Sequence, residues 1–239
     1  TARAQNRPLD LSVEVIFDEG ADFIHQDHNG FIWLAFGNQI VRYDGVTCQV
    51  YQNVSSDTTT IGDGYYWAAA SAADGAIWLG NFTTGLDRMT GYGGRVEHWR
   101  AAPDDPRGLT GRALLRLLVD SIERVWAGTP RGLNLFEKAR GSFVHYLHNP
   151  SDSTSLPGNF IGALAEDTSG NIWIGTDRGL ARYDSESESF ERFGFQFPIS
   201  FVHRLVLLSA LVGAGDRLHP PRFPLLIHRR LFRKHVVLG

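Results

Sequence analysis

The chain repeats itself about every 47 residues, and this repeat constrains its fold more than any other feature of the sequence. Four similar segments, "GFIWLAF", "GAIWLGN", "ERVWAGT" and "GNIWIGT", are each centred on a tryptophan. These tryptophans, Trp33, Trp78, Trp126 and Trp173, are 45, 48 and 47 residues apart. A glycine lies three residues before the tryptophan in every copy except the third, which has Glu123. A chain of this kind folds by stacking copies of one small structural unit against each other.

Each copy has the pattern of four short β-strands. In the last copy, residues 161–167 and 171–176 are short runs rich in apolar and β-branched side chains, and the "TSG" between them is typical of a turn. A second turn ends in Gly179, which can adopt a positive φ angle, and the segments "LARYD" and "SFERF" supply two further strands. Four strands in about 47 residues match one blade of a β-propeller. The sequence therefore predicts an all-β chain, a β-propeller segment of four four-stranded blades.

The repeated tryptophan has two interpretations: a packing residue between blades, or a platform on which a sugar or base stacks. Four copies at one strand position favour packing, because a ligand seldom needs the same platform in every blade. Each buried indole removes about 150–250 Å² from water, an upper bound of roughly 4–6 kcal/mol. If the first blade lacks a neighbour on one side, Trp33→Ala costs less stability than Trp78→Ala or Trp126→Ala.

The segment "EDTSGNIWIGTDRGLARYD" (166–184) resembles the two-component regulator propeller repeat, and "NPSDSTSLPGN" (149–159) resembles the linker between such repeats. The resemblance extends over about residues 10 to 197. In that family the repeats build large extracytoplasmic propellers of bacterial sensor proteins. These sensors usually continue into a small β-sandwich, a membrane helix, and a histidine kinase, hybrid kinase or diguanylate cyclase. Strings like "GxIWxGT" also occur in other propellers, including the streptogramin lyases.

The resemblance implies a sensory, ligand-binding module of a bacterial signalling receptor. Such a module is periplasmic or extracytoplasmic and, in the full-length protein, tethered to the inner membrane. Its expected partners are a small-molecule or oligosaccharide ligand and a downstream signalling module. Two alternatives remain: an enzyme like the streptogramin lyases, or a plain protein-interaction scaffold. The enzyme would need histidine and acidic side chains that converge on the propeller axis, and the sequence alone does not place them, so we expect this chain not to be an enzyme.

Charge divides the chain into unequal parts. Residues 1–197 carry 16 Lys and Arg against 25 Asp and Glu, whereas residues 198–239 carry 7 against 1. The acidic repeat region argues against nucleic acid as a partner, because nucleic-acid binding needs a basic face. We therefore divide the chain into an N-terminal leader remnant (1–9), propeller repeats (10–197) and a basic tail (198–239). The leader contains "ARAQ", which has the small-x-small pattern of a signal-peptidase site.

The basic tail has no blade pattern, and its longest uncharged apolar stretch, Leu205 to Gly215, is too short to span a membrane. It can be a basic amphipathic anchor or sequence that does not belong to the fold, and we favour the second interpretation. Propellers have about four to eight blades, and the family resembled here builds larger rings. We therefore expect an incomplete ring, whose exposed end blades pair with missing blades or self-associate.

No catalytic constellation is evident, and we predict neither a metal site nor a cofactor. The sequence contains no Gly-rich phosphate loop, HExxH or GxSxG motif. The lone cysteine, Cys48, occupies a repeat position that Val or Phe fills elsewhere, which predicts a small buried hydrophobe. We interpret the pairs His25/His28 and His145/His148 as ordinary surface or edge residues. The repeated aspartates are predicted to form turns, and they are Asp57, Asp105 and Asp152.

Candidate binding residues follow from propeller topology. The turns between the second and third strands of the blades lie on one face, around the axis, and rigidly held loops often bind ligands. The candidate ligand-binding residues in these turns are Asn38, Thr83, Thr84, Arg131, Asp177 and Arg178. Arg131 and Arg178 share one repeat position, and neighbouring arginines can hold a carboxylate or a sulfate through paired hydrogen bonds.

Overall fold

The computed structural model describes residues 20–93, 95–101 and 107–193. The leader, the first residues of the repeat region, Asp105 and the basic tail lie outside the described residues. The described residues form sixteen β-strands and no helix, so they contain no helix able to cross a membrane.

The strands form four antiparallel sheets, each built from four consecutive strands paired in chain order. Blade 1 contains β1 (Phe23–Gln26), β2 (Ile32–Phe36), β3 (Gln39–Tyr43) and β4 (Cys48–Gln52). Blade 2 contains β5 (Tyr66–Ser71), β6 (Ile77–Asn81), β7 (Gly85–Met89) and β8 (Val96–Trp99). Blade 3 contains β9 (Arg116–Val119), β10 (Val125–Thr129), β11 (Gly132–Glu137) and β12 (Ser142–Tyr146). Blade 4 contains β13 (Ile161–Glu166), β14 (Ile172–Thr176), β15 (Gly179–Asp184) and β16 (Ser189–Phe193). The prediction of four four-stranded propeller blades is confirmed.

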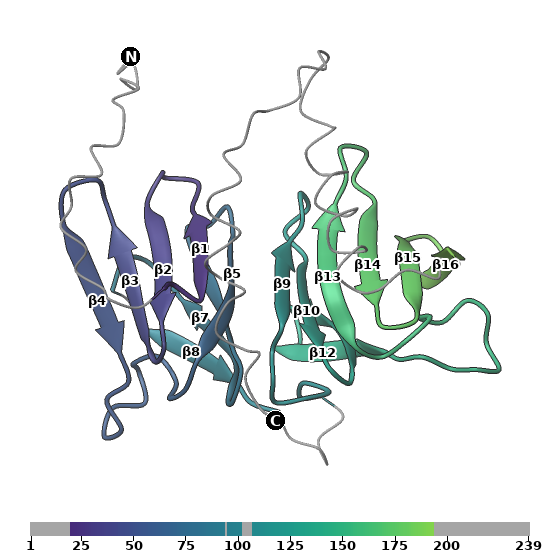
Figure 1. Cartoon of the computed structure of the whole chain (residues 1–239), viewed down its shortest axis with the longest axis horizontal. Helices are drawn as coiled ribbons and strands as arrows, with labels where there is room; N and C mark the ends of the chain where they lie inside the picture. The colour runs from purple at the N-terminus through teal and green to yellow at the C-terminus, as the bar shows by residue number, and fades with distance from the viewer. Residues whose placement is uncertain (1–19, 94, 102–106, 194–239) are drawn as a thin grey trace, which may run out of the picture.

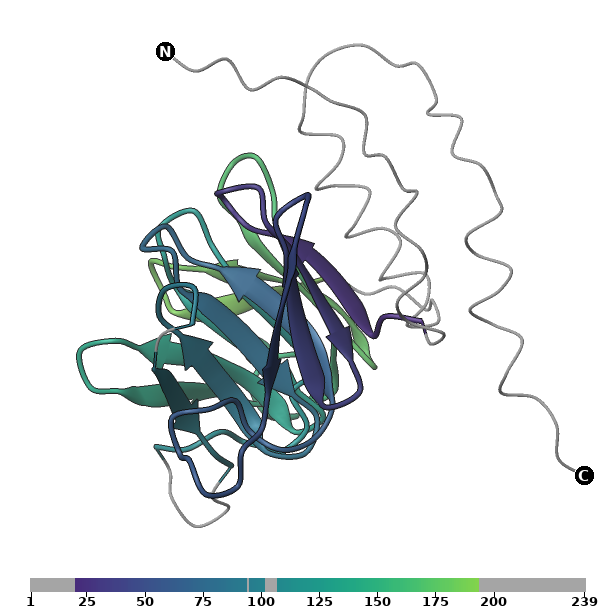
Figure 2. The ribbon, with the colours of Figure 1, turned by 90° about the vertical axis from the view of Figure 1, so that its left-hand side faces the viewer.

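The inner strands β1, β5, β9 and β13 pack against one another in that order. Figure 1 shows them near the middle of the molecule, with blade 1 extending to one side and blade 4 to the other. Seen from the side in Figure 2, the blades fan out from these strands. The described residues therefore form a curved arc of blades.

Strand register reproduces the repeat read from the sequence. Trp33 pairs with Arg42, Trp78 with Arg88, and Trp173 with Arg182 across the second and third strands. The turn between β6 and β7 holds three residues where the other blades have two, which accounts for the one-residue offset in the second copy. Gly179, which begins β15, has a φ of +147°, as its place after a tight turn predicts.

Each tryptophan points forward, onto the next blade. Trp33 packs with Ile77 and Leu79 of blade 2, and Trp126 packs with Ile172 and Ile174 of blade 4. Trp33 and Trp126 are fully buried and Trp78 is nearly so, which confirms the packing interpretation for these three. Blades 3 and 4 approach so closely that a Cβ on Gly128 would lie 2.6 Å from Ile161 Cγ2. The glycine after the "IWL" and "VWA" strings of blades 2 and 3 therefore suits the close packing of blades.

This direction of packing corrects two expectations. Trp33 faces blade 2. Trp173 faces the side of blade 4 where no further blade lies among the described residues, and it is only half-buried. Cys48 was expected to be buried but is exposed. Its repeat position points backward onto the preceding blade, where Val96, Phe143 and Phe190 are buried, and blade 1 has no preceding blade among the described residues.

Candidate functional site

The antiparallel order of the strands gives the arc two faces. The turn between the first and second strands of each blade lies on one face, which we call the first-turn face. The turn between the second and third strands lies on the opposite face, together with the linkers between blades, and we call this the second-turn face. All six predicted ligand-binding residues lie in turns of the second-turn face: Asn38, Thr83, Thr84, Arg131, Asp177 and Arg178.

Several of these side chains take part in holding the turns and linkers. The hydroxyls of Thr83 and Thr84 both donate to the carbonyl of Asp63, at 3.3 Å. Asp177 Oδ1 accepts a hydrogen bond from the backbone of Phe160, and its other oxygen lies 4.0 Å from Arg178 Nε. The side chain of Arg178 is 65% exposed. The second-turn face therefore offers solvent-accessible cations, and ligand binding there stays a prediction.

Buried polar side chains of the third strands anchor the linkers on this face. Asp87 Oδ2 accepts the backbone N–H of Gly62 at 2.7 Å, and Asn134 Oδ1 accepts that of Thr110 at 2.9 Å. Asp87 also contacts His98 at 2.7 Å and Arg100 at 2.6 Å. Burial opposes ionisation of Asp87, but hydrogen bonds and the nearby arginine outweigh it and lower its pKa. The hydrogen bond to Asp87 raises the pKa of His98.

The linkers also contain the repeated aspartates predicted to form turns. Asp57 accepts the backbone N–H of Thr59 at 2.9 Å, and Asp152 accepts that of Thr154 at 2.8 Å. The turn prediction is confirmed for these two aspartates. His145 also contacts a backbone carbonyl, that of Gly108, at 2.6 Å.

On the first-turn face, an aspartate six residues before the tryptophan accepts its indole N–H. Asp27 accepts from Trp33 at 2.9 Å, Asp120 from Trp126 at 2.9 Å, and Asp167 from Trp173 at 2.8 Å. The other oxygen of each carboxylate accepts two backbone N–H groups of the same turn, two and four residues further on. The sequence analysis missed this contact, although an aspartate at this spacing in three of four copies was a readable signal.

A concave site lies on the first-turn face, at the inner ends of the blades. This axial hollow has a volume of about 550 Å³ and is lined by residues from all four blades. Its polar lining residues are His25, His28, Ser71, Asp120, Ser121, Glu123 and Glu166. Ligand pockets typically have volumes of about 300–1,000 Å³. The hollow therefore has the size and the mixed polar and apolar lining of a small-molecule site.

Hydrogen bonds across the hollow connect neighbouring blades. His25 Nε2 lies 3.1 Å from Ser71 Oγ, which joins blade 1 to blade 2. Glu166 accepts the backbone N–H of Ser121 at 2.7 Å and also contacts its hydroxyl, which joins blade 4 to blade 3. Burial lowers the pKa of His25, so this imidazole is neutral near pH 7. In the described part of the chain, no three His, Cys, Asp or Glu side chains could together hold a metal ion.

Glu123 departs from the repeat at this hollow. The other copies have glycine at this position, with φ angles of +79° to +87°, and Glu123 adopts +66°. A non-glycine residue in this region carries backbone strain of order 1–3 kcal/mol, and such residues concentrate at functional sites. Glu123 Oε2 accepts the backbone N–H of Ala73 at 3.0 Å, so its carboxylate links blade 3 to blade 2.

Comparison with known proteins supports the prediction of propeller repeats. Residues 155–178 match the family model described as two component regulator propeller. The match begins in the linker before blade 4 and ends in the turn after β14, so this segment is similar to a two component regulator propeller repeat. No curated protein matches the chain.

Two solved structures show the same fold. One is the extracellular domain of a B. thetaiotaomicron protein described as a hybrid two component system, with a TM-score of 0.50 and 23% identity over 70% of this chain and 29% of that one. The other is a catalytically inactive virginiamycin B lyase from Staphylococcus aureus with quinupristin, with a TM-score of 0.54 and 13% identity over 74% of this chain and 56% of that one. The chain thus spans less than two thirds of either protein.

Proposed function

We propose that this chain is part of the extracytoplasmic, ligand-binding propeller of a bacterial signalling receptor of the two-component or diguanylate cyclase type. The observation that carries the proposal is the family match at residues 155–178, in a blade whose tryptophan and aspartate geometry recurs in blades 1 and 3. The similarity to the extracellular domain of a two component system supports the same role.

The axial hollow is the surface on which ligand binding would affect the whole arc. A ligand in the hollow contacts side chains of all four blades, so it favours one relative placement of the blades over others. A ligand can shift an equilibrium between two arrangements only by its difference in affinity for them. Binding between blades provides such a difference, and an attached output module would respond to it.

The lining of the hollow suits a polar organic ligand such as a small oligosaccharide. Neutral His25 and the Ser71 hydroxyl can each donate and accept hydrogen bonds, while Glu123 and Glu166 accept them. The alanine and leucine side chains of β5 and β9 supply an apolar wall. The arginines of the second-turn face provide a separate surface for anionic groups.

The proposal is tested by titration calorimetry of this chain against neutral and acidic oligosaccharides, with two variants that separate the faces. His28→Ala removes a side chain of the axial hollow that is exposed and therefore matters little for folding. Arg131→Ala removes a side chain of the second-turn face. Loss of binding in only one variant identifies the face, and absence of binding to every sugar contradicts an oligosaccharide-sensing role. The receptor context is tested separately by reading the gene on both sides of the coding segment for a membrane helix and a kinase or cyclase.

One observation favours an enzyme as a second candidate. His25, His28, Glu123 and Glu166 converge on the axial hollow, which is the arrangement that a lyase-like propeller would need. The virginiamycin B lyase structure also has a TM-score above that of the sensor domain. Incubation of the chain with quinupristin, followed by mass spectrometry, tests this candidate; cleavage that His25→Ala abolishes would favour the enzyme, and an intact substrate would exclude this activity.

A further inference from the structure

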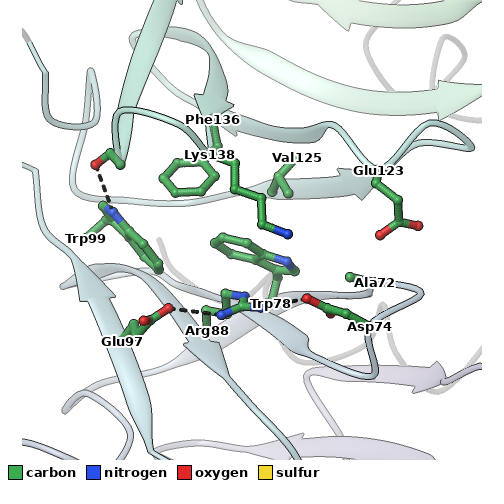
Figure 3. Close-up of a pocket in the computed structure, with 11 residues that line it drawn as sticks. Ala72, Asp74, Trp78, Arg88, Glu97, Trp99, Glu123, Val125, Phe136 and Lys138 are labelled. Carbon is green, nitrogen blue, oxygen red and sulfur yellow. Dashed lines mark hydrogen bonds and ion pairs between the residues drawn. The ribbon is translucent and has the colours of Figure 1, made fainter.

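The interface between blades 2 and 3 lacks the aspartate that the other blades place beneath their tryptophan. Ala72 occupies this position, six residues before Trp78. A cavity of about 350 Å³ opens there between the two blades, and Ala72 and Trp78 both line it. Figure 3 shows the indole of Trp78 in the middle of the side chains that line this cavity. The space that an aspartate side chain would enter is thus part of a pocket.

The backbone around Ala72 keeps the conformation of the aspartate turns. Ala72 N donates to Ala76 O at 2.9 Å, as Asp120 N donates to Arg124 O at 3.0 Å. Gly75 N donates to Ala72 O at 3.0 Å, matching the bond from Glu123 N to Asp120 O at 2.9 Å. The turn therefore has the backbone conformation that surrounds a carboxylate in the other three blades, but Ala72 has no carboxylate to place there.

Two donors that a carboxylate satisfies in the other blades are left open. The indole N–H of Trp78 has no acceptor among the described residues, and Trp78 lines the cavity. The backbone N–H of Asp74, which corresponds to the donors of Asn29, Ile122 and Ser169, likewise has no acceptor in the described chain. Ala76 N is the exception, because Asp74 Oδ1 accepts its hydrogen bond at 3.0 Å. Both donors lie at the cavity, where a ligand can accept hydrogen bonds from them.

Two cations, Arg88 and Lys138, and three acids line the cavity, and the charge of Lys138 contributes to the lowered pKa of Asp74. Arg88 pairs with Asp74 at 2.7 Å and with Glu97 at 3.1 Å. Lys138 makes no hydrogen bond or ion pair with a described residue, and Figure 3 shows its ammonium group pointing over Trp78 into the cavity. Glu123, the remaining acid of the lining, already accepts the backbone N–H of Ala73. In blades 2 and 4 the position of Lys138 is taken by Gly91 and Ser185, so this cation is particular to the interface with the open donors.

We propose that this cavity binds a small organic carboxylate, whose carboxylate replaces the missing aspartate side chain. One oxygen accepts the indole N–H of Trp78 and the other accepts the backbone N–H of Asp74, while Lys138 supplies the counter-charge. The apolar body of the ligand lies against Val125, Phe136 and Trp99, which complete the lining. The site is distinct from the axial hollow, and the inference does not rest on the proposed signalling role.

Benzoate is a suitable probe, and benzamide, of the same shape but uncharged, is its matched control. The readout is the set of indole N–H resonances of the six tryptophans in the ¹⁵N-labelled chain, with the Trp78 resonance assigned through Trp78→Phe. Benzoate is expected to shift the Trp78 resonance saturably, and benzamide to bind at least about tenfold more weakly, because it lacks the charge. Lys138→Gln should weaken benzoate by about tenfold and leave benzamide unchanged.

Ala72→Asp supplies the missing carboxylate from within the chain. The Trp78 resonance of this variant should be shifted without ligand and should not respond to benzoate. Val46→Asp adds the same charge at a side chain that is 87% exposed on blade 1, and it should bind benzoate like the unmodified chain. If Ala72→Asp does not fold, Ala72→Leu fills the same space without a charge and should also abolish binding.

Three results would overturn the proposal. A Trp78 resonance that stays in place up to the solubility limit of benzoate would show that the cavity binds no carboxylate of this kind. Equal affinity for benzamide would show that a neutral acceptor suffices. Undiminished binding in both Ala72 variants would place the ligand elsewhere.

Discussion

The interface between blades 3 and 4 and the interface between blades 2 and 3 share one backbone arrangement but differ in how it is filled. Between blades 3 and 4, Asp120 accepts hydrogen bonds from Trp126 and Arg124, and the hydroxyls of Tyr146 and Tyr183 lie 3.1 Å apart. Between blades 2 and 3, Ala72 leaves the indole of Trp78 without an acceptor among the described residues and leaves a cavity. At the first interface the indole N–H finds its acceptor in a side chain of the protein. At the second interface no described side chain accepts it.

The comparison shows that the backbone and the side chain at the position of Asp120 and Ala72 have separate roles. The turn conformation does not depend on the aspartate side chain, because Ala72 has the same backbone hydrogen bonds as its counterparts. The side chain instead satisfies buried donors between blades, and its loss leaves the fold intact while it creates a polar opening. In a repeat protein the other copies show what a position requires, so a copy that departs from them indicates where a ligand can substitute for a side chain.

Truncation of the tryptophans should have the largest effect and should rank the interfaces. We expect Trp126→Ala to lower the free energy of unfolding by roughly 3–5 kcal/mol, since it removes a fully buried aromatic side chain and its hydrogen bond. Trp173→Ala should cost the least, because Trp173 faces the side of blade 4 where no further blade lies among the described residues and is half-buried. Trp78→Ala should fall between them, because a cavity already adjoins Trp78.

Urea unfolding, followed by circular dichroism so that loss of tryptophan does not affect the signal, measures these differences. A cost for Trp173→Ala that equals that of Trp126→Ala would show that the outer face of blade 4 is covered as well as an interior face.

Removal of Asp120 should make the interface between blades 3 and 4 resemble the interface between blades 2 and 3, which lacks the aspartate. Asp120→Ala leaves the donors of Trp126 and Arg124 without their acceptor, at a cost of roughly 2–4 kcal/mol. Asp74→Ala is the control: Asp74 belongs to the equivalent turn in blade 2, but it is exposed, so the loss of its hydrogen bond from Ala76 and its ion pair with Arg88 should cost less than about 1 kcal/mol. Thermal unfolding of both variants gives the comparison, and equal small losses would show that the aspartate contributes little to blade packing.

Much of the fold was predictable because the repeat presents the same evidence four times. Strands, turns and the one-residue offset in blade 2 follow from short-range patterns that recur in register. The direction in which a side chain points was not predictable, since a period of two in a strand does not say which face meets the next blade. This is why the exposure of Cys48 was misjudged, and why the direction in which Trp33 faces could not be predicted.

The sites were harder to predict than the fold. The pairing of Asp120 with Trp126 could have been predicted, because an aspartate lies six residues before the tryptophan in three of the four copies. The same comparison would have shown that Ala72 is the exception. The axial hollow could not, because His25, Glu123 and Glu166 are brought together only by the curvature of the arc. The six residues predicted on the second-turn face lie where topology places them, and their role in binding stays a prediction.

The linkers extend the comparison to pH, because blade 2 anchors its linker through charged Asp87 and blade 3 through neutral Asn134. The pKa of His98 is raised in the folded chain by its bond to Asp87, so protonated His98 stabilises the fold fully below its ordinary pKa of 6.5. This contribution is lost as the pH rises through the raised pKa. We therefore expect the melting temperature to fall across this window, and His98→Gln to reduce the slope. His145→Gln, at the corresponding position of blade 3, is the control; an unchanged slope in His98→Gln would mean that another group controls the pH response.

The smallest effect on stability is expected at the second-turn face, where Arg131 and Arg178 share one repeat position in blades 3 and 4. Both side chains are exposed, and the ion pair that the described residues offer the Arg178 side chain is a distant one with Asp177, at 4.0 Å. Arg131→Ala and Arg178→Ala should therefore each change the free energy of unfolding by less than about 0.5 kcal/mol. If this face binds an acidic oligosaccharide, each variant should weaken binding by about 1.5–3 kcal/mol, the range for hydrogen bonds to charged groups. Titration calorimetry of the single and double variants separates the two roles. Neither exposed arginine is expected to affect folding, so a change in affinity reports on binding alone. Unaltered affinity in the double variant would show that neither arginine belongs to the binding site.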